Sequence, residues 1–167
     1  LHLEENRRGD IVFDVSSLPG SLLAGDILFP ALGHVIGSAS GKSVPVIVGL
    51  HGATEDQLKA LGSAAAAAGA VGMFHAVGLT PEAPDLATAL HGRPASKTVV
   101  DTAQALRDAC RELTTVADGP IGAVSVGTPH ASLAEMTRVA DLLDGRRVAA
   151  GVEAYISTGR AVAATAD

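Results

Sequence analysis

The chain has 167 residues, 47% of them hydrophobic, and a formal net charge of −6. This length fits one domain and is long enough for a hydrophobic core. The negative charge argues against a nucleic-acid partner, since binding a phosphate backbone requires clustered Lys and Arg, and the absence of 18 uninterrupted apolar residues argues against a membrane span.

Strand and helix patterns alternate along the first hundred residues. The helix over 54–69 has the clearest signals, because Thr54 and Gln57 form a capping box and Gly69 is typical of a helix end. Pro30 and several glycines interrupt the pattern over 22–38, which predicts two short helices or a kinked one. The other predicted elements are a charged entry loop at 2–8, strands at 10–15, 44–50, 70–76 and 97–100, and a short helix at 85–90.

The same alternation continues to residue 167. Asp101 is expected to cap a helix, and Ser132 and Glu135 form a second capping box. The remaining predicted elements are strands at 121–126 and 148–156, a helix at 132–144 and a last helix from 157. Repeated strand–helix–strand units imply right-handed crossovers. The sequence therefore predicts an α/β fold with three αβα layers around a mostly parallel sheet, in a single domain over 1–167.

The single cysteine bears on compartment and on metal binding. Cys110 cannot form an intrachain disulfide, and a lone thiol favours a reducing compartment, so we expect a cytoplasmic protein. Cys110 also lies on the apolar stripe of its helix, which favours a buried structural thiol over a metal ligand.

A polar loop joins the apolar run at 121–126 to the helix at 132–144. Open α/β sheets bind ligands at the carboxyl ends of their strands, which is where this loop lies. His130 stands directly before the helix start, where it can face a ligand. We therefore interpret residues 127–135 as a candidate ligand site.

Three stretches carry a resemblance to a known family. They are GTPHASLAEMTRVADLLDGRRV at 127–148, FPALG with KSVPVIVGL between 29 and 50, and MFHAVGLTPEA at 73–83. In this order they resemble the aconitase X family, hydro-lyases related to aconitase, over nearly all of the chain. The resemblance implies an aconitase-like domain and an internal fragment of a longer catalytic region, partnered by its remaining domains or a small subunit. Because the family's active site forms between domains, the isolated fragment is expected to be inactive.

The resemblance implies a dehydratase that acts on a small hydroxy acid. Our first expectation is cis-3-hydroxy-L-proline as substrate and Δ1-pyrroline-2-carboxylate as product. The alternative is mevalonate 5-phosphate, for which the candidate phosphate-binding cations are Arg7, Arg8, Lys42 and Arg160. An alternative of another class is a non-catalytic α/β module that supplies interfaces or binds a small acid.

The resemblance also implies an iron–sulfur cluster. Thr128 occupies the position at which some members carry a cluster-binding cysteine, and a hydroxyl is a poor substitute for a thiolate on iron. We therefore expect no metal site within this chain, and the cluster ligands to lie outside residues 1–167.

Candidate site residues follow from the same resemblance, and several have a structural alternative, which for His130 is a polar residue ahead of a helix start. The candidate catalytic residues are His130, His75 and Ser157, and the candidate substrate-binding residues are Thr128, Pro129, Ser132, Thr80, Glu82, Arg160 and Arg7. The alternatives are a core position for His75, a loop hydrogen bond for Thr128, a solvated charge for Arg7, and helix-start positions for Glu82, Ser157 and Arg160.

Overall fold

The computed structural model describes residues 3–100, 102–116 and 118–166. Contacts between residues divide the chain into two compact units, Leu1–Thr115 and Val116–Asp167. The sequence suggests a single domain, whereas each of these units has a sheet of its own.

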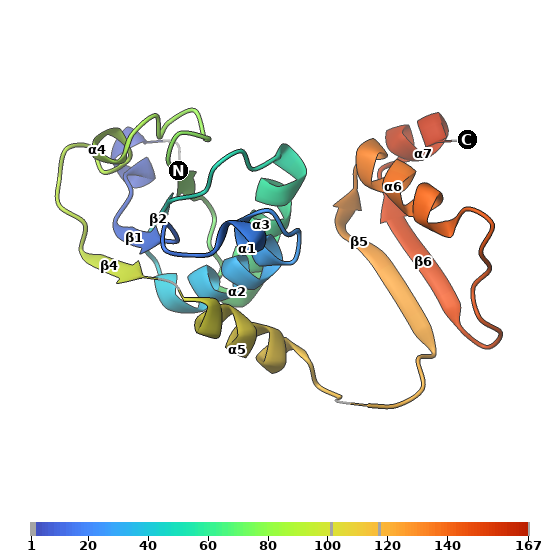
Figure 1. Ribbon diagram of the computed structural model, residues 1–167. Helices are drawn as coiled ribbons and strands as arrows, with labels where there is room; N and C mark the ends of the chain where they lie inside the picture. The colour runs from blue at the N-terminus through green and yellow to red at the C-terminus, as the bar shows by residue number, and fades with distance from the viewer. Residues whose placement is uncertain (1–2, 101, 117, 167) are drawn as a thin grey trace. The chain divides into compact units, whose positions relative to one another are not determined.

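The first unit contains a four-stranded sheet in which every strand pair is parallel (Figure 1). Its order is β3-β2-β1-β4, and the strands are β1 (Ile11–Asp14), β2 (Pro45–Val48), β3 (His75–Ala76) and β4 (Lys97–Val100). The predicted α/β class and parallel pairing are confirmed. Because the chain moves outward from β1 in one direction and then returns to its other side, the topological switch point lies at the carboxyl ends of β1 and β4.

The two faces of this sheet have separate cores, because successive strand residues point to opposite faces. Phe13 and Ile47 belong to the larger core, whereas Val12 and Val46 belong to the smaller one. The larger core is covered by α2 (Leu28–Ser40), α3 (Glu55–Gly69) and α5 (Ala103–Leu113), and the smaller core by α4 (Leu86–Ala89). Helices therefore cover both faces, as the sequence predicts.

Helices α2 and α3 pack closely along a line of three glycines. A Cβ atom on Gly37 would lie 2.5 Å from the carbonyl oxygen of Ala65 and 2.8 Å from the Cβ of Ala68. Cβ atoms on Gly33 and Gly69 would likewise meet backbone atoms of the facing helix. This glycine contact of Gly33, Gly37 and Gly69 sets how closely the two helices approach.

The helix starts follow their predicted signals. The region over 22–38 forms two helices, α1 (Gly20–Leu23) and α2, and Pro30 lies in the first turn of α2, where its missing N–H is not needed. The Thr54 side chain accepts a hydrogen bond from the Gln57 N–H at 3.2 Å, and the Gln57 side chain accepts one from the Thr54 N–H at 2.9 Å. The predicted capping box of α3 is confirmed. Within the described residues, every helix is too short or too polar to traverse a bilayer.

We expect Thr54→Ala to lower the free energy of unfolding of the complete protein by about 1 kcal/mol, because it removes the cap acceptor. Ser63 lies inside the same helix and makes no side-chain hydrogen bond to the described residues, so Ser63→Ala is the matched control. Urea denaturation of both variants measures the difference. Equal stability of the two variants would mean that the cap contributes nothing.

Three predicted elements of the first unit differ from the structure. The strand predicted over 70–76 is limited to the two residues of β3, because Ala70 takes a left-handed conformation (φ 55°) to end α3. The predicted entry loop contains a 3₁₀ turn, η1 (Glu4–Arg7). Asp101 lies outside the described residues, and α5 begins after Thr102, whose hydroxyl accepts a hydrogen bond from the Ala105 N–H at 3.2 Å.

The second unit has a two-stranded parallel sheet, and each of its strands is followed by a helix. Its elements are β5 (Ala123–Ala131), α6 (Leu133–Leu143), β6 (Glu153–Thr158) and α7 (Arg160–Ala166). The prediction that β5 ends at residue 126 is wrong, because the strand continues through the polar motif to Ala131. The register with β6 shifts between Val126 and Ala131, so residues 127–130 lie outside the regular pairing.

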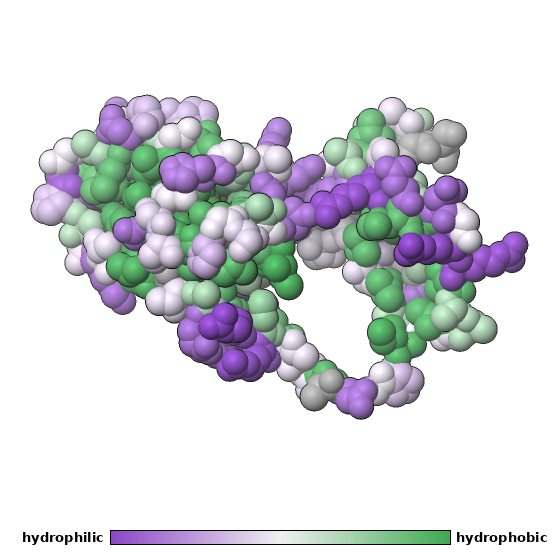
Figure 2. Space-filling model, in the orientation of Figure 1, coloured by the Kyte–Doolittle hydropathy of each residue, from purple (hydrophilic) through white to green (hydrophobic). Residues whose placement is uncertain are grey.

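Apolar side chains of the second unit are largely exposed. Of the residues described there, Ala131 alone is buried, and hydrophobic side chains reach the surface of this unit in Figure 2. The exposed large residues are Val116, Ile121, Val124, Val126, Leu133, Leu142, Leu143, Val148, Tyr155 and Ile156. Parallel sheets normally bury both faces, so this unit has little core of its own.

Candidate functional site

A cavity of about 520 Å³ lies beside β3, at the edge of the first unit's sheet. Four predicted site residues line it, and they come from η1, from β3 and from the loop after β3: Arg7, His75, Thr80 and Glu82. The rest of the wall is mostly apolar and consists of Gly62, Ala66, Val71, Gly72, Met73, Phe74 and Pro81. The structure therefore brings this half of the predicted site together.

His75 is buried, with 1% of its surface exposed. It pairs with Val46 in the sheet, which places its side chain on the face of the smaller core. Its Nε2 lies 2.6 Å from the main-chain carbonyl oxygen of Arg7. Since a carbonyl only accepts, Nε2 carries the proton and donates it. His75 therefore ties η1 to the sheet edge.

Arg7 and Glu82 form a bidentate ion pair at the rim of the cavity. The Arg7 Nε lies 3.1 and 2.8 Å from the two carboxylate oxygens, and Nη2 also donates to Oε1. The hydrogen bond with Arg7 is the main cause that lowers the pKa of Glu82, and the same bond raises the pKa of Arg7. Glu82 is therefore ionised, and the positive charge of Arg7 is compensated within the pair.

Thr80 holds the loop that carries Glu82. Its hydroxyl accepts a hydrogen bond from the Ala76 N–H at 3.0 Å and donates one to the Ala76 carbonyl at 3.2 Å. Both functions of the hydroxyl are used inside the turn, so in this arrangement Thr80 shapes the cavity through the backbone.

A second cavity of about 380 Å³ shares Arg7 and Glu82 with the first. Its other lining residues, Glu4, Thr88 and His91, are absent from the predicted site. His91 follows α4, and only the tertiary folding of residues 77–91 brings it near Glu82. No local pattern in the sequence signals this proximity.

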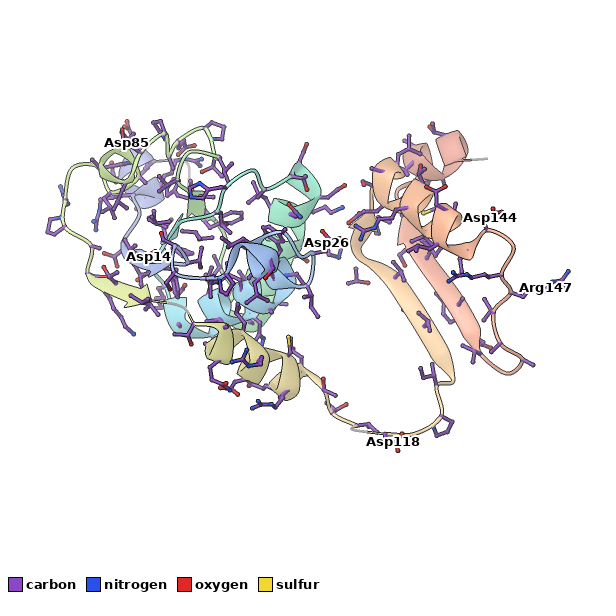
Figure 3. All side chains as sticks on the ribbon, in the orientation of Figure 1. Asp14, Asp26, Asp85, Asp118, Asp144 and Arg147 are labelled. Atoms are coloured by element: carbon purple, nitrogen blue, oxygen red, sulfur yellow. The ribbon has the colours of Figure 1, made fainter. Side chains whose placement is uncertain are left out.

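Sequence reasoning also assigns no role to the carboxyl end of β1, where Figure 3 labels Asp14. The Asp14 carboxylate accepts a hydrogen bond from the Ser16 N–H at 2.9 Å, and its interaction with Ser16 lowers its pKa. Gly49, with φ 96°, allows Ser16 to approach the end of β2, since a Cβ there would lie 2.5 Å from the Ser16 nitrogen. The signal that could have drawn attention to this position is a polar run directly after a buried strand, at the switch point.

In the second unit, predicted residues gather where β5 and β6 end. Gly127 lies so close to Ser157 that a Cβ would meet the Ser157 carbonyl oxygen, and its φ of 98° favours glycine as well. Pro129 is half-buried in the interrupted part of β5. The exposed candidates at this edge are Thr128, His130, Ser157 and Arg160.

Ser132 is engaged in the start of α6. Its hydroxyl accepts a hydrogen bond from the Glu135 N–H at 3.2 Å, and the Glu135 carboxylate accepts one from the Ser132 N–H at 2.8 Å. The second predicted capping box is confirmed. Thr158 donates to the carbonyl of Ala131 at 2.6 Å and so joins the ends of the two strands.

The described residues do not fit an iron–sulfur cluster. Such clusters are held mainly by cysteine thiolates, whereas Thr128 offers a hydroxyl and Cys110 packs against the larger core. No group of three or more His, Cys, Asp or Glu among the described residues could hold a metal ion. We therefore assign no cluster ligand to this part of the chain.

Family models match the chain in two consecutive segments. The aconitase X second domain matches residues 9–111, and the aconitase X third domain matches residues 121–167. The gap between the two matches contains the boundary between the two compact units.

Two relatives have names that describe dehydratases. The chain is 39% identical to the cis-3-hydroxy-L-proline dehydratase of Pseudomonas aeruginosa, over 99% of this chain and 28% of that protein. It is 34% identical to the phosphomevalonate dehydratase large subunit of Methanothermobacter thermautotrophicus, over 99% of this chain and 38% of that protein. The chain thus spans well under half the length of either relative.

A solved structure has the same fold. The holo-form crystal structure of Thermococcus kodakaraensis aconitase X matches with a TM-score of 0.84 and 31% identity, over 100% of this chain and 41% of that one. The second-domain match alone covers more than half of the chain. On this evidence the chain belongs to the aconitase X family.

Proposed function

We propose that the complete protein is a hydro-lyase that removes water from cis-3-hydroxy-L-proline and gives Δ1-pyrroline-2-carboxylate. The observation that carries this proposal is the 39% identity, over almost the whole chain, to a dehydratase of that substrate. A second dehydratase of the same name, from Hypocrea jecorina, is 34% identical. Because the chain spans 28% of the length of each, the activity is proposed for the complete polypeptide.

The proposal includes what surrounds this chain in the complete protein. Remaining domains or a small subunit complete the enzyme, which the name of the related large subunit supports. They also supply the thiolates of an iron–sulfur cluster, because Thr128 and the packed Cys110 are unsuited to it. A reducing, cytoplasmic compartment keeps such thiols unoxidised.

Two of the four candidate phosphate-binding cations are engaged by carboxylates, which favours a substrate without a phosphate group over mevalonate 5-phosphate, the second candidate. A phosphate monoester carries close to two negative charges and is best held by uncompensated cations. Arg7 is paired with Glu82, and the Arg8 guanidinium lies 3.5 Å from the Asp10 carboxylate. A substrate whose one anionic group is a carboxylate has a single negative charge there, which cations already paired with carboxylates can bind more readily than a phosphate.

His130 is the residue proposed to take the substrate proton. Dehydration removes a proton from the carbon beside the carboxylate, the hydroxyl on the next carbon is protonated and leaves as water, and the resulting enamine tautomerises to Δ1-pyrroline-2-carboxylate. A neutral imidazole has one basic nitrogen for this step, and His130 is exposed at the end of β5. The exposed side chains of Thr128, Ser157 and Arg160 are proposed to bind the polar groups of the substrate.

The test is a dehydration assay of the complete polypeptide with cis-3-hydroxy-L-proline beside mevalonate 5-phosphate. Turnover of the first supports the proposal, and turnover of the second alone replaces it with the phosphate-bearing substrate. If the protein is folded and dehydrates neither substrate, the result would favour the alternative of a non-catalytic α/β module. Residues 1–167 alone are expected to be inactive, and detectable turnover by them would contradict that expectation.

A further inference from the structure

The Arg7–Glu82 pair lines two cavities of the first unit, the larger one beside β3 and the smaller one beside α4. We propose that the larger cavity is a carboxylate-binding site in which Glu82 occupies the Arg7 guanidinium until the carboxylate of a ligand replaces it. The inference does not rest on the proposed function, and the ligand is identified only as a small carboxylic acid. The replacement of the Glu82 carboxylate by a ligand carboxylate on Arg7 can be tested by a binding measurement that does not depend on catalysis.

Arg7 has the geometry of a ligand-binding arginine. A guanidinium presents a rigid fork of donors that matches a carboxylate, and its present partner is bound in that bidentate way. Its side chain is 34% exposed, so a solute can reach it. The hydrogen bond from buried His75 to the Arg7 carbonyl fixes the backbone that carries the fork. His75 is therefore a positioning residue for Arg7.

The Glu82 carboxylate is placed where a ligand can displace it from Arg7. Its side chain is 46% exposed and stands on a loop, so water and dissolved anions compete for both partners although the pair is bidentate. The second cavity offers the released carboxylate His91 and the Thr88 hydroxyl, although Glu4 is also there. The carboxylate thus has favourable interactions besides those with Arg7.

The residues that line the larger cavity indicate the chemical character of the ligand beyond its carboxylate. Apart from the ion pair, it is formed largely by apolar and small residues of α3 and of the segment before β3. Gly62 makes room for the ring of Phe74, since a Cβ on Gly62 would lie 2.9 Å from the Phe74 Cε1. An apolar wall beside one guanidinium suits a small acid with a hydrocarbon body, a description that includes a five-membered imino acid.

The experiment measures binding of ¹³C-labelled acetate to the complete protein by ligand-observed NMR at constant ionic strength. Glu82→Gln removes the competing charge and should tighten acetate binding by about two- to fivefold, the range for an exposed ion pair. Glu4→Gln is the matched control, because it removes a neighbouring charge that makes no hydrogen bond to Arg7, and it should change binding by less. Arg7→Met should abolish binding, and Arg7→Lys, which keeps the charge but loses the fork, should weaken it.

The decisive comparison is the double variant Arg7→Met with Glu82→Gln, which should bind acetate as poorly as Arg7→Met alone. Tighter binding in that variant, an equal gain from Glu4→Gln, or no gain from Glu82→Gln would overturn the inference. Inorganic phosphate serves as the second probe, and a gain seen with phosphate but not acetate would overturn the assignment to carboxylates. If acetate behaves as expected and neither substrate is dehydrated, the proposed function fails and the binding site stands.

Discussion

Replacement of His130 by alanine in the complete protein is expected to lower the rate of dehydration by about 10²- to 10⁴-fold. This is the usual contribution of a positioned general acid or base. The side chain is exposed in the interrupted part of β5 rather than buried in a core, so the variant should fold normally. Steady-state kinetics with cis-3-hydroxy-L-proline measures the loss, and circular dichroism verifies the fold.

His51→Ala is the matched control for this variant. His51 is another exposed histidine, it follows β2 in the first unit, and it has no role in the proposed reaction. Its replacement should leave kcat unchanged. Equal kcat for wild type and His130→Ala would remove His130 from the site, whereas equal losses in both variants would point to a general effect of losing a histidine.

The second large effect is expected for stability, from Gly37→Ala in the glycine contact. The new Cβ would lie 2.5 Å from the Ala65 carbonyl oxygen, a distance that real Cβ atoms do not adopt. Helices α2 and α3 must separate to relieve the overlap, and this loosens the larger core. We expect the free energy of unfolding to fall by about 3 kcal/mol, the upper part of the range for overpacked positions.

Gly20→Ala provides the control for this measurement. Gly20 begins α1 in the same unit, and a Cβ there would meet no atom within 4 Å. Its replacement should leave stability unchanged or slightly raise it, because alanine favours helix. Denaturant unfolding of the complete protein compares the two variants, and a similar stability for both would show that the glycine contact tolerates a methyl group.

Local signals in the sequence were sufficient for the helix starts and the fold class. Thr54 with Gln57, and Ser132 with Glu135, bond within four residues of chain, so the pattern itself contains both partners. The division into two units was not predictable in this way. Alternating strands and helices do not reveal which strands pair, and among the described residues β5 pairs with β6 alone.

The candidate site was predictable only in part. The resemblance singled out Arg7 and Glu82, but their bidentate pairing joins residues 75 positions apart, which no periodicity encodes. The same holds for the bond from His75 to the Arg7 backbone, which explains the burial of that histidine. Residue types can suggest chemistry, whereas the partner that occupies each group depends on tertiary folding.

The exposed sheet of the second unit has a consequence for how the protein folds during synthesis. The first unit has two cores and can fold once its own residues have emerged, whereas an isolated two-stranded pair is at best marginally stable in water. The pair β5–β6 therefore becomes stable only once further chain packs against its faces. Until then its valines and isoleucine are exposed hydrophobic side chains on the nascent chain, of the kind that chaperones bind.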